Sequence, residues 1–130
     1  MQYWSLLFLL FVSACSILLP EPDKTQQISR ATSLYSCHFL FKETAETTYD
    51  LLLQSRLSQI SDSLLLQAKR IAMKLGGEVL NDKISKDGQQ EFDMFMAKMR
   101  SVISIVERNQ RFKEFSKSCA DMSGIILNAG

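Results

Sequence analysis

Apolar residues recur along most of this chain at a spacing near 3.6 residues, which is the period of an amphipathic α-helix and not of a β-strand. The pattern predicts a first helix from about Gln27 to Leu53. One face of this helix gathers mostly apolar residues, namely Leu34, Cys37, His38, Phe41, Ala45, Tyr49 and Leu52. Because these positions share one side of the helix, we expect them to pack against other helices.

The apolar stripe then changes phase, turning by about a third of a turn around the helix axis. This shift predicts a break between Ser55 and Asp62 and a second helix after it. The stripe of the second helix runs through Leu57, Ile60, Leu64, Ala68, Ile71, Leu75 and Val79. The pair Gly76-Gly77 weakens this helix and is interpreted as its C-terminal cap, and the polar stretch 81–88 is predicted to be a loop.

A third helix is predicted to begin near Ser85 or Asp87, because either side chain can cap a helix start and Asp87 has capping-box spacing to Gln90. Its stripe comprises Phe92, Phe95, Met96, Met99, Val102, Ile103 and Val106. Another phase shift around Asn109 separates it from a last helix with the stripe Phe112, Phe115, Cys119, Met122 and Ile126. The predicted fold is therefore all-α, a small antiparallel four-helix bundle with short connections.

The start of the chain has a different pattern. Residues 3–19 carry no charge, and residues 3–12 are almost all bulky and apolar before the small Ser13 and Ala14, as in a signal peptide and its cleavage region. The run Val12-Ser13-Ala14-Cys15 resembles the lipobox of bacterial lipoproteins. The resemblance implies removal of residues 1–14, acylation of Cys15 and, in enteric bacteria, sorting to the outer membrane because Ser16 follows. Residues 15–26 are then a lipid-attached linker and residues 27–130 a helical domain.

Two features keep other interpretations of the leader open. No Lys or Arg stands near Met1, and the apolar run continues through Ile17-Leu18-Leu19, where lipoproteins usually carry a polar tether. The chain is then either secreted after cleavage behind Ala14 or held by an uncleaved anchor, since about 17 apolar residues is the lower limit for a transmembrane helix. All three interpretations place the remaining chain outside the cytoplasm, in the cell envelope and facing the periplasm where it is anchored.

In such an oxidising compartment, Cys37 and Cys119 are expected to form a disulfide. The first and last helices of an antiparallel bundle are neighbours, and a rise of 1.5 Å per residue places the two cysteines about 15 and 12 Å from the same end of the bundle. A disulfide between these helices is therefore feasible. Two buried free thiols are the alternative, whereas the spacing typical of a reactive redox pair, Cys-x-x-Cys, does not occur.

Composition and motifs limit the chemistry that we expect. A net charge of +1 gives no strong attraction to nucleic acid. His38 is the only histidine, so we expect no metal site, and no nucleophile elbow, P-loop or dinucleotide fingerprint occurs. The carboxylates Glu43, Glu46 and Asp50 lie off the apolar face and are expected to point to water. We therefore expect neither a catalytic residue nor a cofactor.

The segment 98–117 is rich in basic residues. Those that we single out as candidate partner-binding residues are Arg108, Arg111, Lys113 and Lys117. Such a patch can meet an acidic partner or anionic lipid headgroups, and its alternative explanation is solubility together with favourable charge at a helix C-terminus. The nearby Met94, Met96 and Met99 suit either an adaptable binding surface or the core.

Export, a helical body and a cysteine pair together resemble, in layout, the small periplasmic immunity proteins that block type VI amidase effectors. This resemblance implies a non-enzymatic module that binds another protein in the envelope, as an inhibitor, immunity or exclusion factor, or assembly accessory. The alternatives are a structural tether between an anchored end and a basic turn, a simply secreted helical protein, and a small enzyme built on Glu43, Glu46 or Asp50.

Overall fold

The structure is a computed structural model that describes residues 23–124, so Cys15 and the predicted lipobox lie outside the described residues. It contains three helices, α2 (Lys24–Thr47), α3 (Leu51–Ser101) and α4 (Ile105–Ser123). The prediction of an all-helical chain is confirmed for this range, in which no strand occurs. The predicted count of four helices is not confirmed, because the second and third predicted helices are joined in α3.

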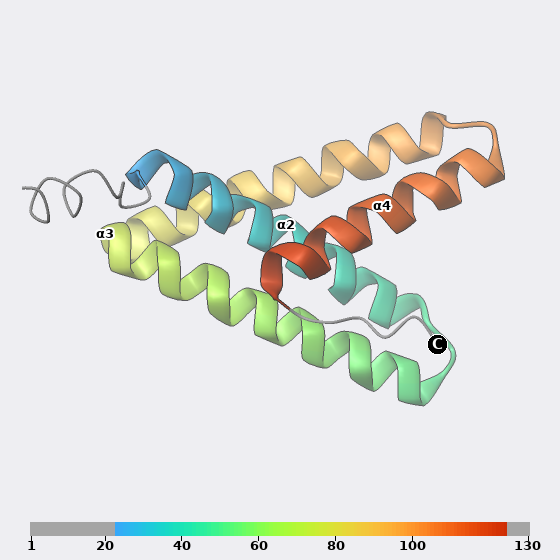
Figure 1. The fold of residues 1–130 in the computed structure, drawn as a ribbon, viewed down its shortest axis with the longest axis horizontal. Coiled ribbons are helices and arrows are strands. Elements are labelled where there is room, and N and C mark those ends of the chain that lie inside the picture. The colour runs from blue at the N-terminus through green and yellow to red at the C-terminus, as the bar shows by residue number, and fades with distance from the viewer. Residues whose placement is uncertain (1–22, 125–130) are drawn as a thin grey trace, which may run out of the picture.

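Helix α3 changes direction at Gly77, whose φ of 72° and ψ of −160° are not helical. A positive φ of this kind is open to glycine but strained for other residues, so the glycine permits the bend. The bend divides α3 into a first arm, residues 51–76, and a second arm, residues 78–101. Both arms run beside α2 and α4 follows the second arm back, so the turns 48–50 and 102–104 lie at the same end of the molecule (Figure 1).

Helix α2 ends and α3 begins at other residues than predicted. Polar side chains set these ends, whereas the prediction relied on the change of phase in the apolar pattern. The hydroxyls of Thr47 and Thr48 donate hydrogen bonds to backbone carbonyl oxygens one turn earlier, and the backbone of Thr48 is already extended. Asp50 then caps α3 by accepting bonds from the backbone N–H groups of Leu52 and Leu53. The break predicted between Ser55 and Asp62 is therefore wrong, and the chain turns at 48–50.

The predicted loop 81–88 is also wrong, because this polar stretch is part of the second arm of α3. Three of its residues hold the arm against α2. Ile84 is 1% exposed, Gly88 is buried, and Asn81 accepts a hydrogen bond from the hydroxyl of Tyr35. These inward contacts stabilise a helix where the polar composition alone indicated a loop.

Helix α2 lies at the centre of the fold, between the two arms of α3 (Figure 1). Five consecutive residues, 34–38, are buried, and consecutive helical residues point in different directions around the axis. At residues 34–38 the helix is therefore covered on all sides instead of burying a single stripe. Helix α4, in contrast, contacts the other two helices only sparingly.

Gly88 lies where α2 and the second arm of α3 approach closely. A Cβ atom at this position would stand 2.5 Å from Cβ of Tyr35 and 2.9 Å from the carbonyl oxygen of Thr32. Neither atom can move without moving α2, so only glycine fits this crossing.

We predict that Gly88→Ala lowers the free energy of unfolding by about 1–3 kcal/mol, the usual effect of overpacking a filled core. The matched control is Gln89→Ala, at the adjacent exposed position of the same helix, which should leave stability within about 0.5 kcal/mol. Urea unfolding followed by circular dichroism measures both. Equal stability of the wild type and Gly88→Ala would show that the two helices are further apart than described.

Candidate functional site

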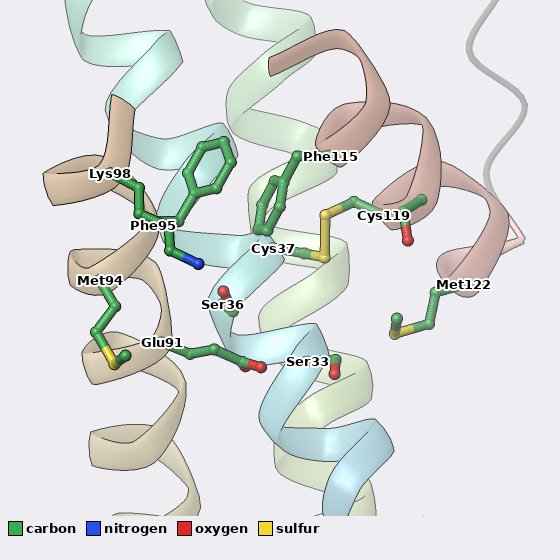
Figure 2. Close-up of a pocket in the computed structure, with 11 residues that line it drawn as sticks. Ser33, Ser36, Cys37, Glu91, Met94, Phe95, Lys98, Phe115, Cys119 and Met122 are labelled. Atoms are coloured by element: carbon green, nitrogen blue, oxygen red, sulfur yellow. A yellow bond between two sulfur atoms is a disulfide. The ribbon is translucent and has the colours of Figure 1, made fainter. Parts of the chain in front are cut away.

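An open groove of about 350 Å³ lies between α2, the second arm of α3, and α4. Figure 2 shows side chains from all three helices facing it. Its walls are largely apolar and come from Met94 and Phe95 on α3 and from Phe115 and Met122 on α4. Its volume is within the range of small-ligand pockets, and a mostly apolar lining with a few polar groups is typical of binding sites.

The disulfide forms one side of this groove. Cys37 of α2 and Cys119 of α4 have their sulfur atoms 2.11 Å apart and their Cα atoms 5.6 Å apart, a disulfide distance, as the sequence predicted. Both cysteines are buried. Since α4 contacts the other helices sparingly, this bond is its main attachment to α2.

Aromatic rings attach α4 to the second arm of α3 near the groove. The ring of Phe95 stacks on Phe115 with centroids 4.5 Å apart and meets Phe112 edge-on at 5.3 Å. Such pairs add about 0.5–1.5 kcal/mol beyond the apolar area that they bury. The sequence placed all three phenylalanines on apolar stripes, but it gave no indication that they meet across the two helices.

Polar groups stand along the apolar walls. Glu91 and Lys98 on α3 are exposed and line the groove, as does Ser33 on α2 (Figure 2). The hydroxyl of Ser36 is buried and finds no hydrogen-bond partner in the part of the chain that the structure describes. An unpaired buried hydroxyl costs about 1–3 kcal/mol.

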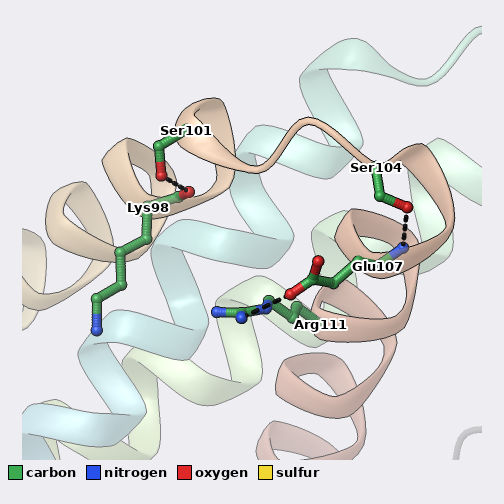
Figure 3. A network of polar contacts seen from close by, with 5 residues as sticks. All are labelled: Lys98, Ser101, Ser104, Glu107 and Arg111. Atoms are coloured by element: carbon green, nitrogen blue, oxygen red, sulfur yellow. Dashed lines mark hydrogen bonds and ion pairs between the residues drawn. The ribbon is translucent and has the colours of Figure 1, made fainter.

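The four predicted partner-binding residues follow the turn between α3 and α4, and the structure does not gather them around the groove. Figure 3 shows Ser104 capping α4 by accepting a bond from the backbone N–H of Glu107, whose carboxylate pairs with Arg111 at 2.8 Å. Arg108 is half-buried and donates to the carbonyl of Val102 at 2.5 Å. Lys113 and Lys117 are exposed on α4.

The same cap corrects the predicted end of the third helix. It ends at Ser101 and not near Asn109, because Ser104 starts a new helix and Val102 is extended. Three residues predicted to lie on its apolar stripe, Val102, Ile103 and Val106, are therefore outside it. Two of them are exposed, Ile103 at 95% and Val106 at 80%.

A second groove, of about 390 Å³ and more polar, lies between α2 and the first arm of α3. Nδ1 of His38 is 2.9 Å from both the carbonyl oxygen and the hydroxyl oxygen of Ser61, and this hydroxyl is 3.2 Å from the carbonyl oxygen of His38. When Nδ1 carries the proton, the imidazole donates to the Ser61 carbonyl and the hydroxyl donates to the His38 carbonyl; when it does not, Nδ1 accepts from the hydroxyl. In either tautomer the pair links the two helices.

Burial lowers the pKa of His38, and the nearby ammonium of Lys42 acts in the same direction, while the Ser61 carbonyl and Asp62 partly oppose them. The imidazole is therefore neutral at pH 7. The apolar pattern of the sequence places His38 on the packed face, but nothing in the sequence indicates Ser61 as its partner, because serines are common on exposed helix surfaces.

The three carboxylates considered for acid–base chemistry do not face one site. Glu43, Glu46 and Asp50 are all exposed. Glu46 lines the groove beside His38, Glu43 lines a smaller cavity next to Phe92, and Asp50 caps α3. Within residues 23–124 no group of three metal-ligating side chains comes together, and no described helix is long and apolar enough to cross a bilayer.

Comparison with known protein families, with curated proteins and with solved structures finds no match for this chain.

We predict that the double variant Cys37→Ala/Cys119→Ala loses about 4 kcal/mol of unfolding free energy, because the disulfide closes a loop between residues 82 positions apart. Hydrogen exchange should also accelerate more in α4 than in α2 and α3. The control is Ser118→Ala, at the exposed position next to Cys119, which leaves this bond intact. Uniform acceleration over all three helices would show that α4 is held by packing and not by the disulfide.

We predict that stability decreases as the pH falls below the ordinary histidine pKa of 6.5. The folded protein binds the proton less readily than the unfolded chain, so stability is complete above 6.5 and is lost as the pH falls toward the lowered pKa. Urea unfolding at pH 7.5 and 5.5 measures the effect. His38→Asn, which retains a donor but does not titrate, should flatten this dependence, and an unchanged slope would assign it to other groups.

Proposed function

We propose that this protein is a membrane-anchored helical module of the cell envelope that binds another protein without catalysis. The observation that carries the proposal is the open apolar groove beside the disulfide. The leader supports export and attachment through Cys15, as its lipobox-like run implies. In this proposal the helical domain is the compact bundle that the sequence predicts, with both arms of α3 serving as separate bundle members.

The composition of the groove favours a protein partner. Met94 is 62% exposed, and Met122 lies on the opposite wall, so two flexible thioethers face the opening. Methionine adapts its shape to different apolar side chains and is common on surfaces that bind proteins. Phe95 and Phe115 add a more rigid aromatic wall, of the kind into which the anchor residue of a partner packs.

Charged groups beside the groove also bear on the partner. Lys98 and Glu91 both line it, so a cation and a carboxylate stand along its apolar walls. Such a pair orients a partner that carries complementary charges. Lys113 and Lys117 are exposed on α4 outside the groove lining, and Arg108 and Arg111 are partly engaged within their own turn.

A structural tether is a second candidate, favoured by one observation. The first turn of α2 lies at the opposite end of the molecule from the turn between α3 and α4 (Figure 1). An anchor preceding α2 would therefore leave this second turn free to reach another surface.

The proposal predicts that a photo-crosslinking amino acid at Met94 of the full chain, in its native envelope, yields a covalent adduct with a protein of defined mass. The same label at Leu66, which is half exposed on the first arm of α3, is the matched control and should yield none. Met94→Asp should reduce recovery of the partner at least tenfold, because it places a charge in the apolar opening. Equal labelling from both positions, or no adduct from Met94, would contradict the proposal.

A further inference from the structure

Two apolar turns lie at the same end of the molecule (Figure 1). The turn between α2 and α3 exposes Tyr49, Leu51 and Leu52. The turn between α3 and α4 exposes Ile103, Ile105 and Val106. Each of these six side chains is at least 70% exposed. Single exposed apolar residues are ordinary, but a set gathered at one end of a small domain is typical of an interaction surface.

The two turns carry opposite charge. The acidic turn, residues 43–53, contains Glu43, Glu46 and Asp50 and has no Lys or Arg. The basic turn, residues 100–111, contains Arg100, Arg108 and Arg111. Its one acidic residue, Glu107, pairs with Arg111, so the turn keeps a net charge of +2. Each turn therefore complements the other both in its apolar centre and in the charge around it.

We propose that this end binds a second copy of the same chain, with the acidic turn of each copy against the basic turn of the other. A two-fold axis perpendicular to the helices and to the line joining the turns brings about both contacts at once. Interfaces of this kind are self-complementary, and two-fold dimers are the commonest oligomers. This inference does not depend on the proposed function, because the groove lies elsewhere.

The charges disfavour the other simple occupants. An anionic bilayer would attract the basic turn but repel the three carboxylates at the same end. An acidic protein would meet the same repulsion, and a basic protein would be repelled by the arginines. In a second copy, the two-fold rotation places its basic turn opposite the acidic turn of the first copy and its acidic turn opposite the basic one. Both turns then meet opposite charge.

The dimer has a defined shape. It is extended, because the two copies meet end to end and their helices continue in opposite directions. Helix α2 contains 24 residues, about 36 Å at 1.5 Å per residue. The first turns of the two α2 helices are therefore about 70 Å apart, at the far ends of the dimer.

Charge reversal provides a test that includes its own control. Glu43→Lys/Glu46→Lys makes both turns basic, and Arg100→Glu/Arg111→Glu makes both acidic. We expect each variant alone to weaken self-association of the full chain at least tenfold in sedimentation equilibrium with density-matched detergent. An equimolar mixture of the two variants should restore the dimer mass, because each turn then faces one of opposite sign. All samples keep the same leader, so the leader cannot produce this difference.

The apolar centres are tested in the same way. Ile103→Ser/Val106→Ser should also weaken the dimer at least tenfold. The matched control is Leu66→Ser/Val79→Ser, which removes two exposed apolar side chains outside the turns and should leave the mass unchanged. Circular dichroism confirms that each variant is folded.

A photo-crosslinking amino acid at Ile103 shows which turn of the second copy lies against the basic turn. In a mixture of ¹⁴N- and ¹⁵N-labelled chains it should link to residues 49–53 of the other copy. A monomer at all concentrations, a dimer that charge reversal does not affect, or links from Ile103 to Ile103 would each overturn the proposal. A wild-type chain that stays monomeric but captures a different envelope protein at Ile103 would assign the turns to that partner instead.

Discussion

Helix α2 crosses the second arm of α3 at Gly88, where α3 contributes no side chain, and this close approach allows the middle of α2, residues 34–38, to be buried on all sides. The first arm covers the opposite side of α2 through Leu64, Ala68 and Ala72, which are fully buried. A helix surrounded in this way needs small residues on its neighbours, since large ones would hold the neighbouring backbones apart. The bend at Gly77 makes the arrangement possible, because it lets a single helix supply both covering arms.

Helix α4 occupies what remains of the surface of α2 and packs there incompletely. A disulfide and three phenylalanine rings attach it, and the groove lies in the space between these attachments. The candidate binding site is therefore a consequence of the fold: α2 is almost fully covered by α3, and the last helix leaves an apolar opening. The disulfide holds α4 in this position, because a helix with so few contacts would otherwise detach easily from α2.

The two proposed interaction surfaces serve different purposes and lie on different parts of the molecule. The groove is concave and lined by flexible side chains, which suits a partner that inserts a side chain. The turns at the end of the molecule protrude, and their opposite charges suit a second copy. If the chain is anchored through Cys15, a dimer joined at this end would carry its two anchors at opposite ends and leave both grooves open to partners.

The sequence by itself determined the helical class, about half of the buried positions and the cysteine pair. Their signals are local or covalent: a period of 3.6 residues, and two cysteines at similar heights on helices of opposite direction. Tyr49, Leu52 and Val79, in contrast, were predicted to pack and are exposed. The helix boundaries required the tertiary structure. The stretch 81–88 is polar, yet Ile84 and Gly88 pack against α2 and keep it helical, whereas Ile103 and Val106 fit an apolar stripe but lie beyond the helix end. Only the tertiary structure decided the site, because the pairs His38–Ser61 and Phe95–Phe115 join residues whose contact depends on how the chain turns at 48–50, Gly77 and 102–104.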